Sequence, residues 1–255
     1  MFQWLKLKLK IIVRSSVGIL TAVFIVGCAH VSNPFGDSRS DVIAFSELSE
    51  AQQKHYQLSL NYIESNHYDV AQGKLLSLIE EYPTFPDAYN ALGVVYERRG
   101  RVTIASEAFL NAMALNPEYT TAIENYSRLM CYVAGGDSIV SDSDSIESGQ
   151  LKSMLYTAAS RCYINKNEYA KAMVVVKKAI AGNPSYALNY LYLAQIELYN
   201  HDYVAAKKSI DRFNDLNGYT KESAEIGLLI NQSLGNSTEI EKYQHVLETQ
   251  FKTRV

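Results

Sequence analysis

The sequence predicts an all-α fold, a solenoid of stacked antiparallel helix pairs, and three observations support this. The run PDAYNALGVVYERRGRVTIASEAFLNAMALNP, at residues 86–117, contains two helical segments joined by a short turn. The same pattern of large and small residues returns along the chain at steps of about 34 residues, which indicates a repeat architecture. The chain also holds 19 tyrosines but only 13 glycines. Tyrosine suits stacked helices, because its ring packs while its hydroxyl stays in water.

The unit at residues 86–119 depends on residue size at defined positions. Gly93 and Ala105 are expected where the two helices cross, because small side chains there let the helix axes approach to about 8–10 Å. Pro117 lacks an amide hydrogen and disfavours helical geometry at the residue before it, so it ends the second helix. This is the tetratricopeptide-repeat (TPR) pattern. Its remaining positions are occupied here by Tyr89, Leu92, Tyr96, Phe109 and Ala112.

The repeat frame extends over residues 45–251 and predicts a right-handed superhelical TPR solenoid of about six helix pairs. The third pair is expected to be degenerate, because GGDSIVSDSDSIESG (135–149) is too polar to bury a helix and is typical of a loop or a frayed helix. The last pair has a polar outer face, as the cap of a solenoid needs for solubility. The repeats are expected near residues 52–85, 86–119, 120–152, 153–186, 187–220 and 222–251.

The first 27 residues are typical of an export signal. Four basic and no acidic side chains accompany an apolar run at residues 15–26. That run is shorter than the roughly 20 apolar residues that span a membrane. The following Ile25-Val26-Gly27-Cys28 resembles the bacterial lipobox, in which the cysteine is acylated and cleavage occurs before it. An uncleaved anchor and ordinary secretion are the alternatives.

The lipobox resemblance implies a location and a tether. Ala29 follows the cysteine, and an aspartate at that place is the usual inner-membrane retention signal in such lipoproteins. Its absence implies anchoring in the outer membrane, at the periplasmic face, through Cys28. Residues 28–44 are polar and include Pro34 and Gly36, so they are expected to form the lipidated tether.

Composition and motifs argue against nucleic-acid binding and catalysis. The whole chain has 24 basic and 27 acidic residues, and the signal holds four of the basic ones, which leaves 20 against 27 in the mature chain. No basic run appears. The sequence has no nucleophile elbow, P-loop, zinc-protease motif or paired zinc cysteines. We therefore predict no catalytic residues, no metal, no cofactor and no small-molecule substrate.

Two further cysteines lie late in the first helices of successive repeats. Cys131 and Cys162 are expected to be buried free thiols, because adjacent repeats stand about 10 Å apart and a disulfide needs Cα atoms within about 7 Å. The oxidising envelope keeps a disulfide open as the alternative.

The repeats supply a groove as the candidate site. In a TPR stack, fixed positions of each first helix face the concave side, and apolar residues there suggest a protein partner segment. The first repeat is expected to provide the apolar anchor; coverage by the chain's own tether or neighbouring side chains is the alternative. The predicted groove residues are Tyr56, Leu60, Ile63, Asn90, Val94, Glu97 and Arg128, followed by Met154, Thr157, Arg161, Ile164, Leu188, Leu191, Gln195 and Leu198.

Two segments carry a family resemblance. FPDAYNALGVVYERRGR (85–101) and NYSRLMC (125–131) resemble the second and third repeats of the type IV pilus biogenesis and stability lipoproteins, the pilotins of the PilF/PilW group. Ser127 stands where that family usually has glycine. The resemblance implies a TPR lipoprotein that binds a secretin subunit and helps it reach and multimerise in the outer membrane. The alternative function is an outer-membrane TPR adaptor for cell-wall hydrolases or synthases, and an enzyme is a distant third.

Overall fold

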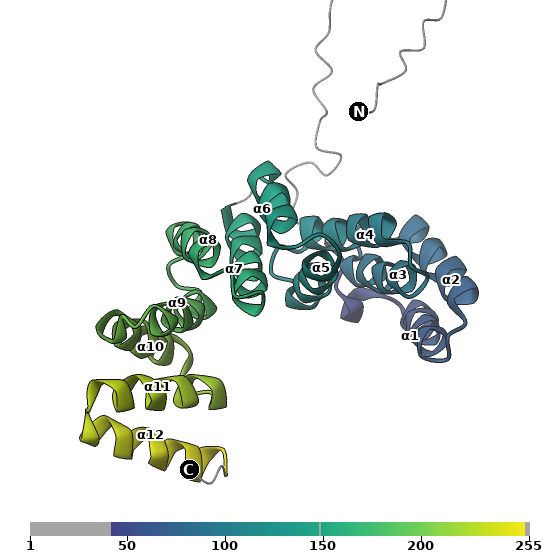
Figure 1. Cartoon of the computed structure of the whole chain (residues 1–255). Helices are drawn as coiled ribbons and strands as arrows, with labels where there is room; N and C mark the ends of the chain where they lie inside the picture. Colours follow the sequence, from purple (N-terminus) through teal and green to yellow (C-terminus); the bar gives the residue numbers. More distant parts are fainter. Residues whose placement is uncertain (1–41, 148, 253–255) are drawn as a thin grey trace, which may run out of the picture. The chain divides into compact units, whose positions relative to one another are not determined.

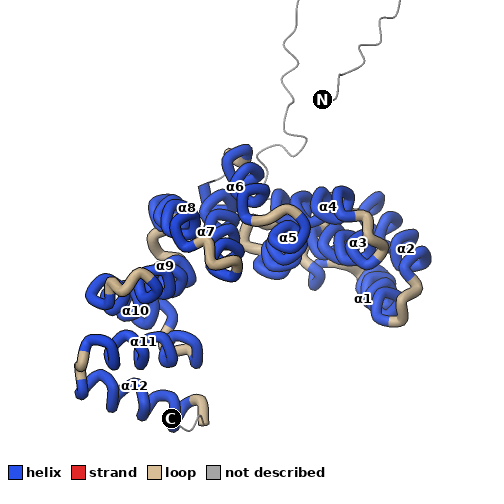
Figure 2. The backbone as a smooth tube through the Cα atoms, in the orientation of Figure 1, coloured by secondary structure: helices blue, strands red, loops and turns tan. Residues whose placement is uncertain are grey.

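The computed structural model describes residues 42–147 and 149–252, which form helices and no strands (Figures 1 and 2). The predicted signal at 1–27, Cys28 and most of the predicted tether lie outside the described residues. A short 3-10 helix, η2 (Phe45–Glu47), comes first. The helices that follow are α1 (Glu50–Glu64), α2 (Tyr68–Glu81), α3 (Pro86–Arg98), α4 (Val102–Leu115), α5 (Thr120–Val133), α6 (Gly136–Ser145), α7 (Gly149–Asn165), α8 (Tyr169–Gly182), α9 (Ala187–Tyr199), α10 (Tyr203–Asn217), α11 (Lys221–Leu234) and α12 (Ser237–Gln250).

These helices pack in sequence order as consecutive pairs. Each helix from α1 to α11 contacts its successor. The first helices of neighbouring pairs also touch, as α5 with α7 and α7 with α9. Each unit therefore rests on its neighbours, as in a repeat solenoid. The predicted all-α solenoid of about six helix pairs is confirmed in the described part of the chain.

The crossing of α3 and α4 shows why residue size matters in this fold. A Cβ atom added at Gly93 would lie 2.5 Å from the ring of Phe109, which is fully buried. Ala105 and Ala112 on α4 are also fully buried. The small residues of the repeat pattern therefore bring the two helices into direct contact.

The turns within the pairs use residues with positive φ. Asn66, Asn167 and His201 adopt this left-handed conformation with φ near 60°, and Gly100 and Gly235 take the same role in other pairs. Asparagine and glycine reach this region at little cost, and it reverses the chain directly after a helix.

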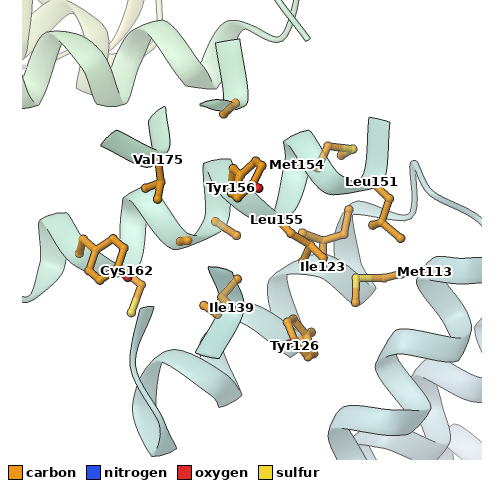
Figure 3. Packing of buried hydrophobic residues seen from close by; sticks show 14 of the residues in the cluster. Met113, Ile123, Tyr126, Ile139, Leu151, Met154, Leu155, Tyr156, Cys162 and Val175 are labelled. Carbon is orange, nitrogen blue, oxygen red and sulfur yellow. The ribbon is translucent and has the colours of Figure 1, made fainter. Parts of the chain in front are cut away.

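The polar segment after α5 forms a helix, α6, so the prediction of a loop or frayed helix is wrong for residues 136–145. The helix is short but packed against its neighbours. Ile139 is fully buried, and so is Ser143, whose hydroxyl donates a hydrogen bond to the Ile139 carbonyl. Figure 3 shows Tyr126, Ile139 and Cys162, from α5, α6 and α7, within one hydrophobic cluster.

Tyrosines of α5 and α7, the first helices on either side of α6, donate hydrogen bonds to the acidic side chains of α6. The hydroxyl of Tyr126 donates to Asp142, that of Tyr156 donates to Asp144, and that of Tyr163 donates to Asp137. The hydrogen bonds join residues 12 to 26 positions apart. Tertiary contacts therefore stabilise this helix, and its polar composition alone does not predict them.

These contacts predict that α6 loosens in acid. The Lys171 ammonium and the Tyr163 hydroxyl lower the pKa of Asp137, and the Tyr156 hydroxyl and Lys178 lower that of Asp144. A lowered native pKa stabilises the fold above the ordinary value near 4, and this contribution is lost as the pH falls through the native pKa.

Hydrogen exchange of the α6 amides, corrected for intrinsic rates, measures this effect. The double variant Asp137→Asn/Asp144→Asn is expected to exchange faster than the wild type at pH 7. The difference should shrink as the pH falls below the ordinary value near 4 and then through the lowered native pKa of each carboxylate, where the wild-type side chains also become neutral. Equal exchange of the two proteins at pH 7 would show that these carboxylates do not hold the helix.

A disulfide joins Cys131 of α5 to Cys162 of α7, so the prediction of free thiols is wrong. The Cα atoms are 5.6 Å apart, well inside the distance that a disulfide needs. The expected separation of about 10 Å between neighbouring repeats does not hold here, because α5 and α7 contact each other directly. The small residues Ser127 and Ala158 lie on these same two helices beside the cysteines.

Candidate partner-binding groove

Three adjoining hollows lie along the first helices of the later pairs. One of about 520 Å³ lies between α5 and α7, and one of about 230 Å³ is lined from α5, α7 and α9. A third, of about 530 Å³, extends from α7 to α9 and α11. Arg161 lines all three, so the hollows adjoin at this side chain, and we call the three together the Arg161 groove. Its other lining residues include Arg128, Tyr132, Lys166, Glu124, Tyr186, Tyr192, Gln195, Tyr199 and Glu222.

Aromatic side chains shape the far end of the Arg161 groove. The Tyr169 and Tyr199 rings stack with their centroids 3.6 Å apart. Burial raises the pKa of Tyr192, and the positive charge of Arg161 nearby acts in the opposite direction. On α9, Gln195 donates a hydrogen bond of 2.8 Å to Glu222 of α11. Amides, aromatic rings and one guanidinium thus line a surface that can contact both the backbone and the side chains of a peptide.

Three predicted groove residues of the second and third repeats link these repeats to each other. The guanidinium of Arg128 donates two hydrogen bonds to the Glu97 carboxylate, at 2.5 and 2.8 Å. Asn125 donates to Asn90 at 3.0 Å, and Asn90 donates in turn to the Tyr119 hydroxyl at 3.4 Å. Arg128 also lines the Arg161 groove. Asn90 and Glu97 line none of its three hollows.

Tyr56, predicted as an exposed anchor of the first repeat, belongs to the hydrophobic core, so that part of the prediction is wrong. Its side chain is only 8% exposed and packs between two rings, with centroids 5.7 Å from Phe45 and 5.3 Å from Phe85. Phe45 comes from the chain before α1. Leu48, from the same stretch, is buried as well.

The segment at residues 43–48 covers the first repeat, which agrees with the alternative of coverage by the chain's own preceding segment. The Ile43 amide donates to the Thr84 carbonyl at 3.1 Å, and the Gln53 side chain donates to the Leu48 carbonyl at 2.9 Å. Leu60 and Ile63 are half-buried against the same cluster. Val94 is half-buried against the central cluster. The first repeat therefore presents less apolar surface than the sequence pattern suggests.

Sequence reasoning missed the rim residues Tyr132, Lys166 and Tyr199. They lie at or just beyond the C-terminal ends of first helices, outside the repeat positions assigned to the groove. Tyr132 is 88% exposed, which is unusual for an aromatic side chain. The clue in the sequence was the pair Tyr132-Val133, two large residues after the last inward position of α5.

Residues 42–147 and 149–252 contain neither a candidate metal site nor a candidate membrane span. No cluster of three or more histidine, cysteine, aspartate or glutamate side chains there could hold a metal ion. No helix in the same residues is long and apolar enough to cross a bilayer.

Comparisons with known proteins agree with this architecture. A family model described as tetratricopeptide repeat matches residues 86–119. The crystal structure of PilW, described as a widely conserved type IV pilus biogenesis factor, superposes with a TM-score of 0.53 at 16% identity, over 80% of this chain and 96% of that one. The fold is a TPR solenoid. A structure of Pseudomonas aeruginosa PilF also gives 0.53, at 20% identity, over 80% of this chain and 93% of that one.

A comparison of sequences supports the same relationship as the comparison of structures. The chain is 23% identical over 225 residues to the type IV pilus assembly protein PilF of Pseudomonas aeruginosa, and the match covers 85% of each chain. The resemblance to type IV pilus biogenesis TPR proteins, which the motifs at residues 85–101 and 125–131 indicate, is confirmed by these similarities.

Proposed function

We propose that this protein is a non-enzymatic scaffold of type IV pilus assembly, anchored in the outer membrane through lipid on Cys28. It binds a secretin subunit and promotes the localisation and multimerisation of that subunit. The observation that carries the proposal is the similarity to PilF, which extends over 85% of both chains and is not confined to one repeat. A match of that extent spans several repeats, so it carries more information than the TPR pattern of a single repeat.

The groove geometry supports a role in holding a protein segment. Stacked repeats present extended surfaces that suit peptides. The Arg161 groove has side chains from α5, α7, α9 and α11, so a bound segment would contact several repeats at once. Leu60, Ile63 and Val94 remain proposed apolar contacts at the N-terminal end of the solenoid. The half-buried state of these three residues leaves part of each side chain accessible.

The lipid anchor on Cys28 is proposed to decide where the protein acts. A single acyl chain gives only marginal membrane binding, and stable anchoring takes more than one chain. A bacterial lipoprotein carries two or three on its cysteine. Cys28 precedes the first described residue by 14 positions, so it lies outside every repeat.

Cys28→Ser is therefore expected to change the location of the protein and leave its fold intact. Fractionation of the cells should find the wild type in the outer membrane and the variant in another fraction. Circular dichroism of both purified proteins should give the same helical content. A variant that stays in the outer membrane would contradict lipid anchoring.

Affinity capture from detergent-solubilised envelope tests the partner. Tagged wild-type protein is expected to recover a pilus secretin subunit, and the soluble form of Cys28→Ser should recover it too. Recovery of a cell-wall hydrolase or synthase in its place, without the secretin, would contradict the pilus assignment and favour the adaptor function.

A further inference from the structure

The hollow between α5 and α7 differs in charge from the rest of the chain. Its lining includes three cationic side chains, Arg128, Arg161 and Lys166, and no carboxylate. The whole chain, by contrast, has more acidic than basic residues. The remaining lining is neutral and consists of Ser127, Cys131, Tyr132, Ala158, Cys162 and Asn165.

Two of the three cations form no direct ion pair with a described residue. Arg128 is neutralised by Glu97, whose side chain is only 17% exposed. None of the ion pairs among residues 42–147 and 149–252 includes Arg161 or Lys166. Arg161 is also half-buried, which strengthens its attraction for an anion relative to a fully hydrated charge. The hollow thus holds two cations without a direct ion pair, with Asp137 acting on Lys166 at longer range and with Glu124 and Glu222 in the adjoining hollows beside Arg161.

The rim and floor of the hollow are suited to an apolar side chain. Tyr132 stands at the rim with 88% of its surface exposed, and tyrosine is enriched among residues that dominate protein interfaces. The floor includes the disulfide between Cys131 and Cys162, which ties α5 to α7. Because the two walls are covalently joined, the site loses little conformational freedom when it binds.

We propose that this hollow binds an acidic peptide segment of the protein partner. Carboxylates of the segment pair with Arg161 and Lys166, and an apolar residue of the segment packs against Tyr132. This inference rests on the proposed function, because it assigns the chemistry of the segment that the scaffold holds.

A peptide fits the surroundings better than a phosphate-rich lipid headgroup. The adjoining hollows contain Glu124 and Glu222 beside Arg161, so a dense negative charge would be repelled on both sides. The same hollows offer Gln195 and tyrosine hydroxyls, which can accept or donate hydrogen bonds to a peptide backbone. Isolated carboxylates along an extended chain can meet the cations and avoid the two acids.

Binding to a peptide array tests the proposal. The array carries short peptides with one central leucine or tyrosine and a rising number of aspartates, with asparagine at the same positions in the matched neutral series. The full-length protein, purified in a neutral detergent, is expected to bind the acidic series with a signal that grows with the number of aspartates and falls with added salt. Equal binding of the two series, or binding of neither, would overturn the proposal.

Substitutions locate the binding to this hollow. For the best acidic peptide in solution, Arg161→Gln is expected to weaken binding about tenfold, which equals about 1.4 kcal/mol. Lys166→Gln, at an exposed position, should act in the same direction, and Arg161→Lys should restore part of the affinity. The matched control is Lys208→Gln, an exposed cation on α10 outside the hollow, which should change nothing. Full affinity in both Arg161→Gln and Lys166→Gln would overturn the assignment.

Two further measurements distinguish the binding of an acidic peptide from the binding of a lipid headgroup and from the scaffold function itself. In the first, glycerophosphoglycerol and unlabelled acidic peptide each compete with the bound peptide. If glycerophosphoglycerol displaces it at the lower concentration, the peptide assignment is overturned in favour of an anionic lipid headgroup. In cells, Arg161→Gln with Lys166→Gln is expected to reduce secretin multimers. Multimers that need the protein but are unchanged in this double variant would overturn the binding of an acidic segment in this hollow and leave the scaffold function standing.

Discussion

Removal of the disulfide between Cys131 and Cys162 is expected to lower the free energy of unfolding by about 4 kcal/mol. The bond closes a loop across 31 positions and connects the first helices of two neighbouring repeats. In the chain-entropy account, cross-linking reduces the freedom of the unfolded chain, and a loop of this length gives an effect of that size. The effect is expected to be local, because each repeat rests on its neighbours, so α5, α6 and α7 should lose protection first.

Thermal unfolding of the Cys131→Ala/Cys162→Ala variant measures this effect. Its midpoint should fall below that of the wild type. Dithiothreitol should lower the wild-type midpoint toward that of the variant and leave the variant itself unchanged, which controls for packing effects of the alanines. A wild type that does not respond to the reductant, although its disulfide is shown to be reduced, would contradict a stabilising bond.

Gly93→Leu is expected to destabilise the protein by about 3 kcal/mol, at the upper end of the range for an overpacked core. The first side-chain carbon would already lie 2.5 Å from one atom of the Phe109 ring and 2.6 Å from another. The ring is fully buried in a closely packed core, so a leucine at position 93 forces the ring or the two helices to shift. Chemical denaturation followed by circular dichroism measures the loss.

The chain offers a matched control for Gly93 in Gly73. That glycine lies within α2, and an added Cβ would meet no atom within 4 Å. Gly73→Ala should therefore stabilise the protein by roughly 0.5–1 kcal/mol, because alanine restricts the unfolded chain and favours helix. If Gly93→Leu were as stable as the wild type, the close packing of α3 on α4 would not be a determinant of the fold.

The sequence could predict the helix pairs because their determinants are local and periodic. Gly93, Ala105 and Pro117 stand at fixed places in one repeat, and the frame returns at about the same step along the chain. A residue that packs against the next helix of its own repeat is predictable from that frame alone. The fold class therefore followed from residue size and spacing.

Helix α6 could not be predicted in the same way, because its stability comes from other repeats. Its own sequence is rich in serine and aspartate, which favour turns over helices. The tyrosines that bind Asp137 and Asp144 belong to α7, and their hydroxyls point to α6 only in the folded chain. The pattern of α6 alone carries no sign of these partners.

The groove residues were partly predictable. The repeat frame shows which face of each helix a residue lies on, but not whether another segment of the chain covers that face. Arg128 and Arg161 lie in the Arg161 groove as the frame predicts. Tyr56 satisfies the same frame, but Phe45 covers its ring, and Phe45 comes from a segment before the first repeat. The frame also uses a standard spacing between repeats, so it could not show that α5 and α7 approach closely enough for Cys131 and Cys162 to join.

The amount of secretin multimer in the outer membrane tests the central claim most directly. The measurement compares the wild type, a strain that lacks this protein, and that strain complemented with either the wild-type chain or Cys28→Ser. Multimers are expected to fall when the protein is absent and to return with the wild-type chain. Cys28→Ser, at equal expression, should not restore them. Normal multimers in the outer membrane of the strain that lacks the protein would contradict its role as a secretin scaffold.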